Sequence, residues 1–100
     1  MALRIKQKYR YADTDWWEWS VWLDGTDHEL DRIEYVTYYL HDSFPKPVRT
    51  VDDRRTKFKL ESAGWGTFML HATVTFKDGT EKGLHHELVL EYPDRTATLR

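Results

Sequence analysis

Two short segments of this chain hold the residues best suited to binding a small, flat chemical group. Residues 40–49 contain Ser43 and Phe44, and residues 63–68, further along the chain, contain Trp65 between two glycines. A serine hydroxyl both donates and accepts hydrogen bonds, and aromatic rings offer flat apolar surfaces. Glycines let another molecule approach the backbone closely. These residue types suit a binding slot formed by two loops.

The same residues do not favour catalysis. His41 and Ser43 lie two positions apart on one loop, and such neighbours rarely reach the geometry of a nucleophile and its base. The chain also has no Gly-x-Ser-x-Gly segment of the kind that presents a nucleophilic serine. We therefore expect that the protein is not an enzyme, and we assign no catalytic residue.

A metal or cofactor site is not indicated either. The chain has five His and no Cys, which makes a closed zinc site improbable. His85 and His86 are adjacent, so on a strand they would point to opposite faces of the sheet. The other histidines show no ligand spacing, and no glycine-rich phosphate loop is present. We expect neither a metal nor a cofactor.

Alternation of apolar and polar residues predicts a chain made mostly of β-strands. The clearest strand covers residues 68–76, and Asp78-Gly79 after it predicts a tight hairpin turn. The other predicted strands cover residues 3–11, 16–23, 33–40, 58–60 and 84–90, with a last edge at residues 97–99.

The segments between these strands carry turn and loop signals. Pro45 and Pro47 predict an exposed loop, because proline cannot donate to a strand ladder. Residues 27–35 predict at most a single helical turn, and the charged residues 51–55 a solvated loop. About seven or eight strands at this spacing predict an all-β, antiparallel β-sandwich.

Length and composition limit the classes of function. One hundred residues, of which 40% are hydrophobic and 32% charged, predict one globular domain covering residues 1–100. The net charge of −2, with both signs interspersed, does not favour nucleic acid as a partner. No window approaches the roughly 20 apolar residues of a membrane helix, so we expect no membrane contact within this chain. The lack of Cys permits a reducing compartment. The oligomeric state is left open.

Four segments together resemble the YEATS domain family, in particular its compact prokaryotic members. They are Trp19-Ser20-Val21-Trp22-Leu23 before Gly25, Val36-x-Tyr38-x-Leu40-His41 with Ser43-Phe44 and Pro47-x-Arg49, Gly64-Trp65-Gly66-x-Phe68, and Val74-x-Phe76. The resemblance covers residues 19–92. It implies an immunoglobulin-like sandwich that binds acylated lysine, in an intracellular protein that is cytoplasmic if the source is prokaryotic.

By this resemblance, the partner is a peptide or protein with an acetyl- or crotonyl-lysine type of side chain. That side chain carries a neutral, flat amide, which needs apolar walls and hydrogen bonds. Phe44 and Trp65 would supply the walls, and the Ser43 hydroxyl would bond the amide. The backbone N–H of Trp65 would bond the acyl oxygen, with Gly64 and Gly66 allowing the close approach.

The resemblance also implies supporting roles. His41 would orient the serine, and Phe68 would close the aromatic wall. Trp16 or Trp17 would cover the slot, although the spacing does not decide between them. Glu87 matches an acidic residue that, in some members, holds a basic residue beside the modified lysine.

Several of these residues also have a structural interpretation. Phe68 lies on an alternating apolar face and is at least as consistent with the core. The two glycines could form a bulge or a turn, and at least one of Trp16, Trp17 and Trp19 should be core. Trp65 between glycines is better explained as a binding residue. The second hypothesis is therefore a YEATS-like scaffold whose aromatic end binds another protein without acyl-lysine recognition.

Overall fold

The computed structural model describes residues 3–12, 16–42, 44–64 and 66–90. Within these ranges the chain forms seven strands and two short helical turns. They are β1 (Arg4–Tyr11), β2 (Trp17–Asp24), α1 (Asp27–Asp31), β3 (Ile33–Tyr39), β4 (Val48–Val51), the 3-10 turn η1 (Arg54–Thr56), β5 (Leu60–Gly64), β6 (Phe68–Phe76) and β7 (Glu81–Leu88). The predicted strand at residues 97–99 lies outside the described residues.

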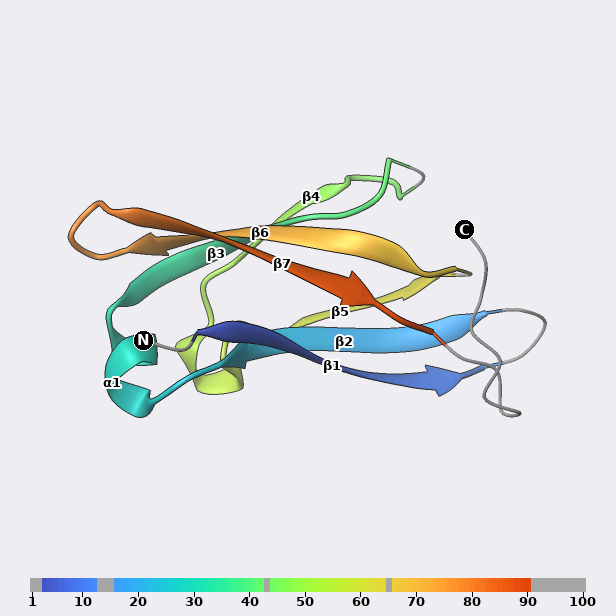
Figure 1. The fold of residues 1–100 in the computed structure, drawn as a ribbon, viewed down its shortest axis with the longest axis horizontal. Coiled ribbons are helices and arrows are strands. Elements are labelled where there is room, and N and C mark those ends of the chain that lie inside the picture. Colours follow the sequence, from blue (N-terminus) through green and yellow to red (C-terminus); the bar gives the residue numbers. More distant parts are fainter. Residues whose placement is uncertain (1–2, 13–15, 43, 65, 91–100) are drawn as a thin grey trace.

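The strands form two antiparallel sheets that pack face to face (Figure 1). One sheet has three strands in the order β1-β2-β5, and the other has four in the order β4-β3-β6-β7. This arrangement confirms the predicted all-β sandwich. Two sheets with one apolar face each must cover those faces, and stacking them does so.

Alternate residues of each strand fill the space between the sheets. Trp17, Trp19, Val21 and Leu23 of β2 are each at most 2% exposed, as the alternation predicted. Every second residue of β6 from Phe68 to its last position is likewise buried. The apolar alternation read from the sequence therefore identifies most of the core.

The strand β4 was absent from our prediction, which placed residues 45–47 in an exposed loop and continued with a solvated loop at 51–55. Val48–Val51 instead pairs with β3, with Tyr39 opposite Val48 and Val36 opposite Val51. Both prolines precede β4, and the strand lies at a sheet edge, where a missing N–H is tolerated. The β-branched residues of this segment then favour the strand.

The two short helical turns are each stabilised by a side-chain cap. α1 confirms the predicted single helical turn, and Thr26 and Glu29 close it with a capping box, the backbone N–H of Glu29 donating to Thr26 Oγ1 at 3.1 Å. The Asp53 side chain caps η1. In the part of the chain that the structure describes, neither turn nor any other helix is long and apolar enough to cross a bilayer.

The order of the strands places the two predicted slot loops together. β3 ends at Tyr39 and β5 ends at Gly64, at the same end of the sandwich at which β6 begins. The β3–β4 loop and the β5–β6 loop are therefore neighbours, as predicted. The hairpin at Gly79, which has a φ of 90°, lies at the opposite end with α1 (Figure 1).

Candidate functional site

Backbone hydrogen bonds close the β3–β4 loop, residues 40–47. The N–H of Leu40 donates to the carbonyl oxygen of Pro47 at 2.6 Å, and the N–H of Phe44 donates to the carbonyl oxygen of His41 at 3.0 Å. These bonds fold the loop back on itself. They fix the point from which the Phe44 ring leaves the backbone.

The Arg49 side chain holds the second half of this loop. Its Nε donates to the carbonyl oxygen of Lys46 at 2.6 Å, and its Nη2 donates to that of Pro45 at 3.3 Å. Lys46 has a φ of 62°, a left-handed conformation that is unfavourable for a residue with a Cβ. The Pro47-x-Arg49 motif therefore has a structural explanation, because the guanidinium group stabilises a strained turn.

Phe44 packs onto an aromatic cluster at the end of the sandwich, which we define as Trp19, Phe44 and Phe68. The Phe44 ring centroid is 5.4 Å from that of Phe68 and 6.1 Å from that of Trp19, the latter pair nearly perpendicular at 80°. A Cβ added at Gly64 would lie 3.3 Å from Phe44 Cζ. Only a residue without a side chain lets the ring lie this close to β5.

The structure brings most of the predicted slot residues together. The His41 ring is 6.4 Å from the Phe68 ring, in an edge contact. Phe68 is only 7% exposed, which agrees with a core position at the base of the cluster. Gly66 is buried in the neighbouring loop. Ser43 and Trp65 lie outside the described residues, so their predicted roles stay predictions.

The two candidates for covering the slot differ in burial. Trp17 is 0% exposed and packs edge-on against Tyr11, with ring centroids 5.1 Å apart, so it belongs to the core. Trp16 is 45% exposed, so it is the member of this pair that lies on the surface. Glu87 lies on the outer face of β7, opposite Met69 of β6.

Sequence analysis did not anticipate the contacts of two residues at this end of the molecule. Trp19 Nε1 is buried without a hydrogen-bond partner among the described residues, and lies 3.6 Å from the position of an added Gly64 Cβ. Such an orphan donor is unusual. Thr67 Oγ1 accepts from the N–H of Leu90 at 3.1 Å and so ties the β5–β6 loop to the segment after β7. Both contacts depend on register between distant strands, which sequence does not show.

A buried bond supports β3 below the cluster. The Tyr38 hydroxyl donates to the carbonyl oxygen of Phe58 at 2.6 Å, and burial raises the pKa of Tyr38 above its ordinary value. Within the described ranges, no group of three or more His, Asp or Glu side chains is arranged to hold a metal ion.

The comparison with family models decides the classification. The model of the prokaryotic YEATS domain matches residues 17–89. The chain belongs to the YEATS domain family. The match includes both slot loops and every strand of the sandwich except β1.

The curated relatives that the chain matches are longer proteins of eukaryotes. The chain is 32% identical over 76 residues to transcription initiation factor TFIID subunit 14 of Schizosaccharomyces pombe, covering 69% of this chain and 31% of that protein. It is 35% identical over 66 residues to human protein AF-9, covering 64% of this chain and 11% of that protein. The chain thus spans a third or less of these relatives.

Solved structures show the same YEATS fold. The Yaf9 YEATS domain bound to H3K27ac has a TM-score of 0.69 at 22% identity, covering 97% of this chain and 79% of that chain. The Yaf9 YEATS domain recognising an H3K122suc peptide has a TM-score of 0.65 at 22% identity, covering 97% and 78%. Both of those structures are YEATS domains with acylated histone peptides.

Proposed function

We propose that this YEATS domain is a binding module for acylated lysine, with the slot between the β3–β4 and β5–β6 loops. The observation that carries the proposal is the position of Phe44. Its ring lies over Gly64 of β5 and against Phe68 of β6, so the two loops meet at an aromatic surface. Solved YEATS neighbours bind acylated histone peptides, which supports the same ligand class here.

The chemistry of an acylated lysine suits this surface. Its amide is flat and neutral, so it can stack on an aromatic ring without bringing an unpaired charge into an apolar site. Phe44 supplies one wall in this proposal and Trp65 the other. The Ser43 hydroxyl and the Trp65 backbone N–H bond the amide, and His41 orients the serine. No group in this assignment performs catalysis.

Calorimetric titration with one peptide sequence in four forms tests the proposal. The central lysine is acetylated, crotonylated, trimethylated or unmodified. We expect the acylated forms to bind and the unmodified form to bind at least about tenfold more weakly, because its ammonium group would lose solvation in an apolar slot. Equal affinity for all four forms, or preference for the trimethylated one, would contradict the proposal.

A matched pair of variants locates the slot. Phe44→Ala should weaken acetyl-lysine binding by about tenfold, the scale of losing one good aromatic contact. Tyr39→Ala removes a ring of similar size from the exposed outer face of β3, five residues away, and should leave affinity unchanged. If the two variants bound equally well, the slot would not be at Phe44.

A second candidate function has an observation of its own. Phe44 is already half-buried against the core, and Tyr39, Val48 and Met69 expose apolar surface on the nearby outer face of the four-stranded sheet. Tyr39 and Val48 are directly opposite each other in register. Exposed apolar groups that gather on one face are typical of protein-interaction surfaces. A scaffold of this kind would bind its partner whether or not lysine is acylated.

A further inference from the structure

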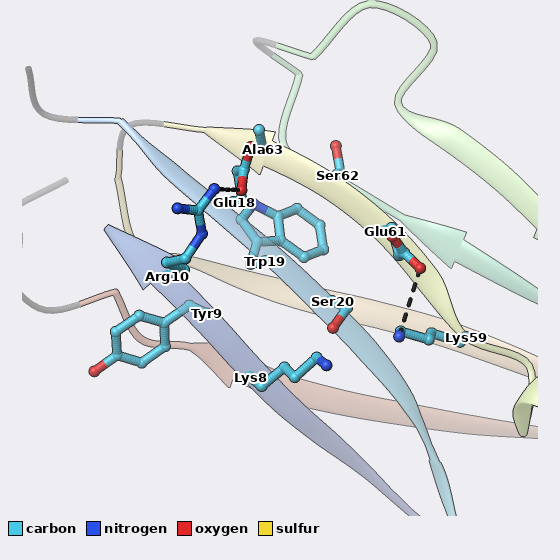
Figure 2. Close-up of a pocket in the computed structure, with 10 residues that line it drawn as sticks. All are labelled: Lys8, Tyr9, Arg10, Glu18, Trp19, Ser20, Lys59, Glu61, Ser62 and Ala63. Atoms are coloured by element: carbon cyan, nitrogen blue, oxygen red, sulfur yellow. Dashed lines mark hydrogen bonds and ion pairs between the residues drawn. The ribbon is translucent and has the colours of Figure 1, made fainter. Parts of the chain in front are cut away.

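A cleft runs along the outer face of the three-stranded sheet. It has a volume of about 610 Å³ and lies over β2 between β1 and β5 (Figure 2). A second hollow of about 360 Å³ continues it past Trp22, and the two share Lys8 and Lys59. We call the two together the basic cleft.

The floor of the basic cleft contains an unsatisfied polar group. Ser20 of β2 lies between Lys8 of β1 and Glu61 of β5 in register. It is 4% exposed, and its Oγ has no hydrogen-bond partner among the described residues. A buried hydroxyl without a partner is costly. Figure 2 shows the Ser20 side chain at the floor of the cleft, beneath the ends of the Lys8 and Lys59 side chains.

Cations outnumber carboxylates along the walls. Two acidic residues, Glu18 and Glu61, line the cleft, and they face Arg10 and Lys59, with Lys59 Nζ 3.5 Å from a Glu61 carboxylate oxygen. Lys8 forms no ion pair with any carboxylate of the described residues. The five cations are Lys8, Arg10, Arg55, Lys57 and Lys59. This excess lies on a chain whose net charge is −2.

The segment that presents the distal cations is strained and firmly held. Lys57 and Phe58 are consecutive non-glycine residues in the left-handed region, with φ of 60° and 59°. The Tyr38 hydroxyl bonds the carbonyl of Phe58, and the N–H of Leu23 donates to that of Lys57 at 2.9 Å. Strained backbone persists only where its surroundings fix it, and it gathers at functional sites. Here it fixes Lys57 beside Trp22.

We propose that the basic cleft is a docking site for an extended, acidic peptide segment that lies over β2. Between Glu18 and Trp22, β2 spans about 13 Å, enough for about four residues of extended chain. Carboxylates of the segment pair with Lys8 and the cations near Trp22, and a polar group of the segment bonds Ser20 Oγ. This inference does not depend on acyl-lysine binding.

The observations favour a peptide over nucleic acid. A nucleic-acid strand carries a phosphate on every nucleotide and would meet Glu18 and Glu61 inside the cleft. An acidic peptide can place neutral residues there. Single strands are also held by stacking on exposed aromatic rings, whereas Trp22 is half-buried in the sheet surface.

Fluorescence anisotropy with three labelled probes tests the proposal on the whole chain. The probes are a peptide of alternating Glu and Ser of about ten residues, the same peptide with Gln for Glu, and oligo-dT of similar length. We expect the Glu peptide to bind at least about tenfold more tightly than the Gln peptide, and we expect its affinity to fall as the salt concentration rises. The proposal would be overturned if none of the probes bound, if the two peptides bound equally, or if oligo-dT bound more tightly than the Glu peptide.

Two variants separate docking from general charge and from folding. Lys8→Glu should weaken binding of the Glu peptide about fivefold or more. Lys77→Glu makes the same charge change in the exposed turn after β6 and should leave this binding unchanged. Ser20→Ala should also weaken binding of the Glu peptide. Its melting temperature should be unchanged or raised, because the substitution removes an unpaired buried hydroxyl. Equal effects of the two charge reversals, or no effect of Ser20→Ala on affinity, would contradict the proposal.

Discussion

The aromatic cluster and the basic cleft are built in different ways. Phe44 is placed by backbone bonds within its own loop and by contact with Gly64 of β5, so its position depends on two short sequence motifs. The basic cleft draws Lys8, Ser20 and Lys59 from three separate segments, and no backbone turn places them together. One region is a tight, apolar contact surface, and the other is broad, charged and shallow.

This difference has a consequence for recognition. A tight aromatic surface discriminates among small groups, because each atom of the ligand is desolvated against a fixed wall. Long Lys and Arg side chains on a sheet surface adapt to their ligand and contribute charge attraction that salt weakens. We therefore expect selectivity for the modified side chain at the cluster, and tolerance of sequence at the cleft.

Phe68→Ala should have the largest effect and should disable both regions. Phe68 is almost fully buried at the base of the cluster and contacts Trp19 as well as Phe44. Removing such a ring leaves a cavity and costs about 3–5 kcal/mol in the free energy of unfolding. Urea denaturation followed by tryptophan fluorescence measures this cost. A loss of acyl-peptide affinity at unchanged stability would make Phe68 a slot residue and not a core residue.

Tyr38→Phe should act on the basic cleft more than on the cluster. It leaves the carbonyl of Phe58 without its donor, and should lower the free energy of unfolding by about 1–2 kcal/mol. The strained segment at Lys57 should loosen, so binding of the acidic peptide should weaken while acyl-lysine binding changes little. The opposite pattern would show that the segment does not shape the cleft.

The same variant has a pH signature. Burial raises the pKa of Tyr38 in the folded state above the value of about 10 in the unfolded chain. Its contribution to stability is therefore complete below pH of about 10 and is lost as the pH rises above it. The stability difference between wild type and Tyr38→Phe should shrink on going from neutral to strongly alkaline buffer. A difference that stayed constant would contradict a buried, neutral phenol.

Gly64→Ala should have the smallest effect on stability and act on the cluster alone. The added Cβ would lie 3.3 Å from Phe44 Cζ, so the ring must move by a few tenths of an ångström. Alanine also reduces the conformational entropy of the unfolded chain. This stabilises the folded state by roughly 0.5–1 kcal/mol and offsets the cost of that crowding. Acyl-lysine affinity should fall a few-fold while acidic-peptide affinity holds. Unchanged binding of both ligands would place the slot away from Gly64.

The fold was largely predictable because burial alternates along the strands. The apolar residues of β2 and β6 identify their inner faces without knowledge of the partners. β4 escaped prediction because two prolines precede it, and its pairing depends on β3. The ends of the other strands are set by backbone hydrogen bonds between strands, and the residue types alone do not show where that pairing stops.

The two regions differ in the same respect. The aromatic end was predictable from motifs in which the residues are close in sequence, and the burial of Trp17 was open until the structure placed it. The basic cleft was not predictable, because Lys8, Ser20 and Lys59 become neighbours only through the register of β1, β2 and β5. Sequence analysis had found the charges interspersed, whereas the sheet gathers them on one face.

Mapping both ligands by nuclear magnetic resonance on one ¹⁵N-labelled sample tests the central claim most directly. An acetyl-lysine peptide and its unmodified form are titrated in turn, followed by the acidic peptide. We predict that acetylation-dependent shifts fall on amides of residues 40–47 and 64–68, and that the acidic peptide shifts amides of β1, β2 and η1. Acetyl-lysine shifts confined to the outer sheet face, or identical shifts from the acetylated and unmodified peptides, would contradict an acyl-lysine slot at the aromatic end.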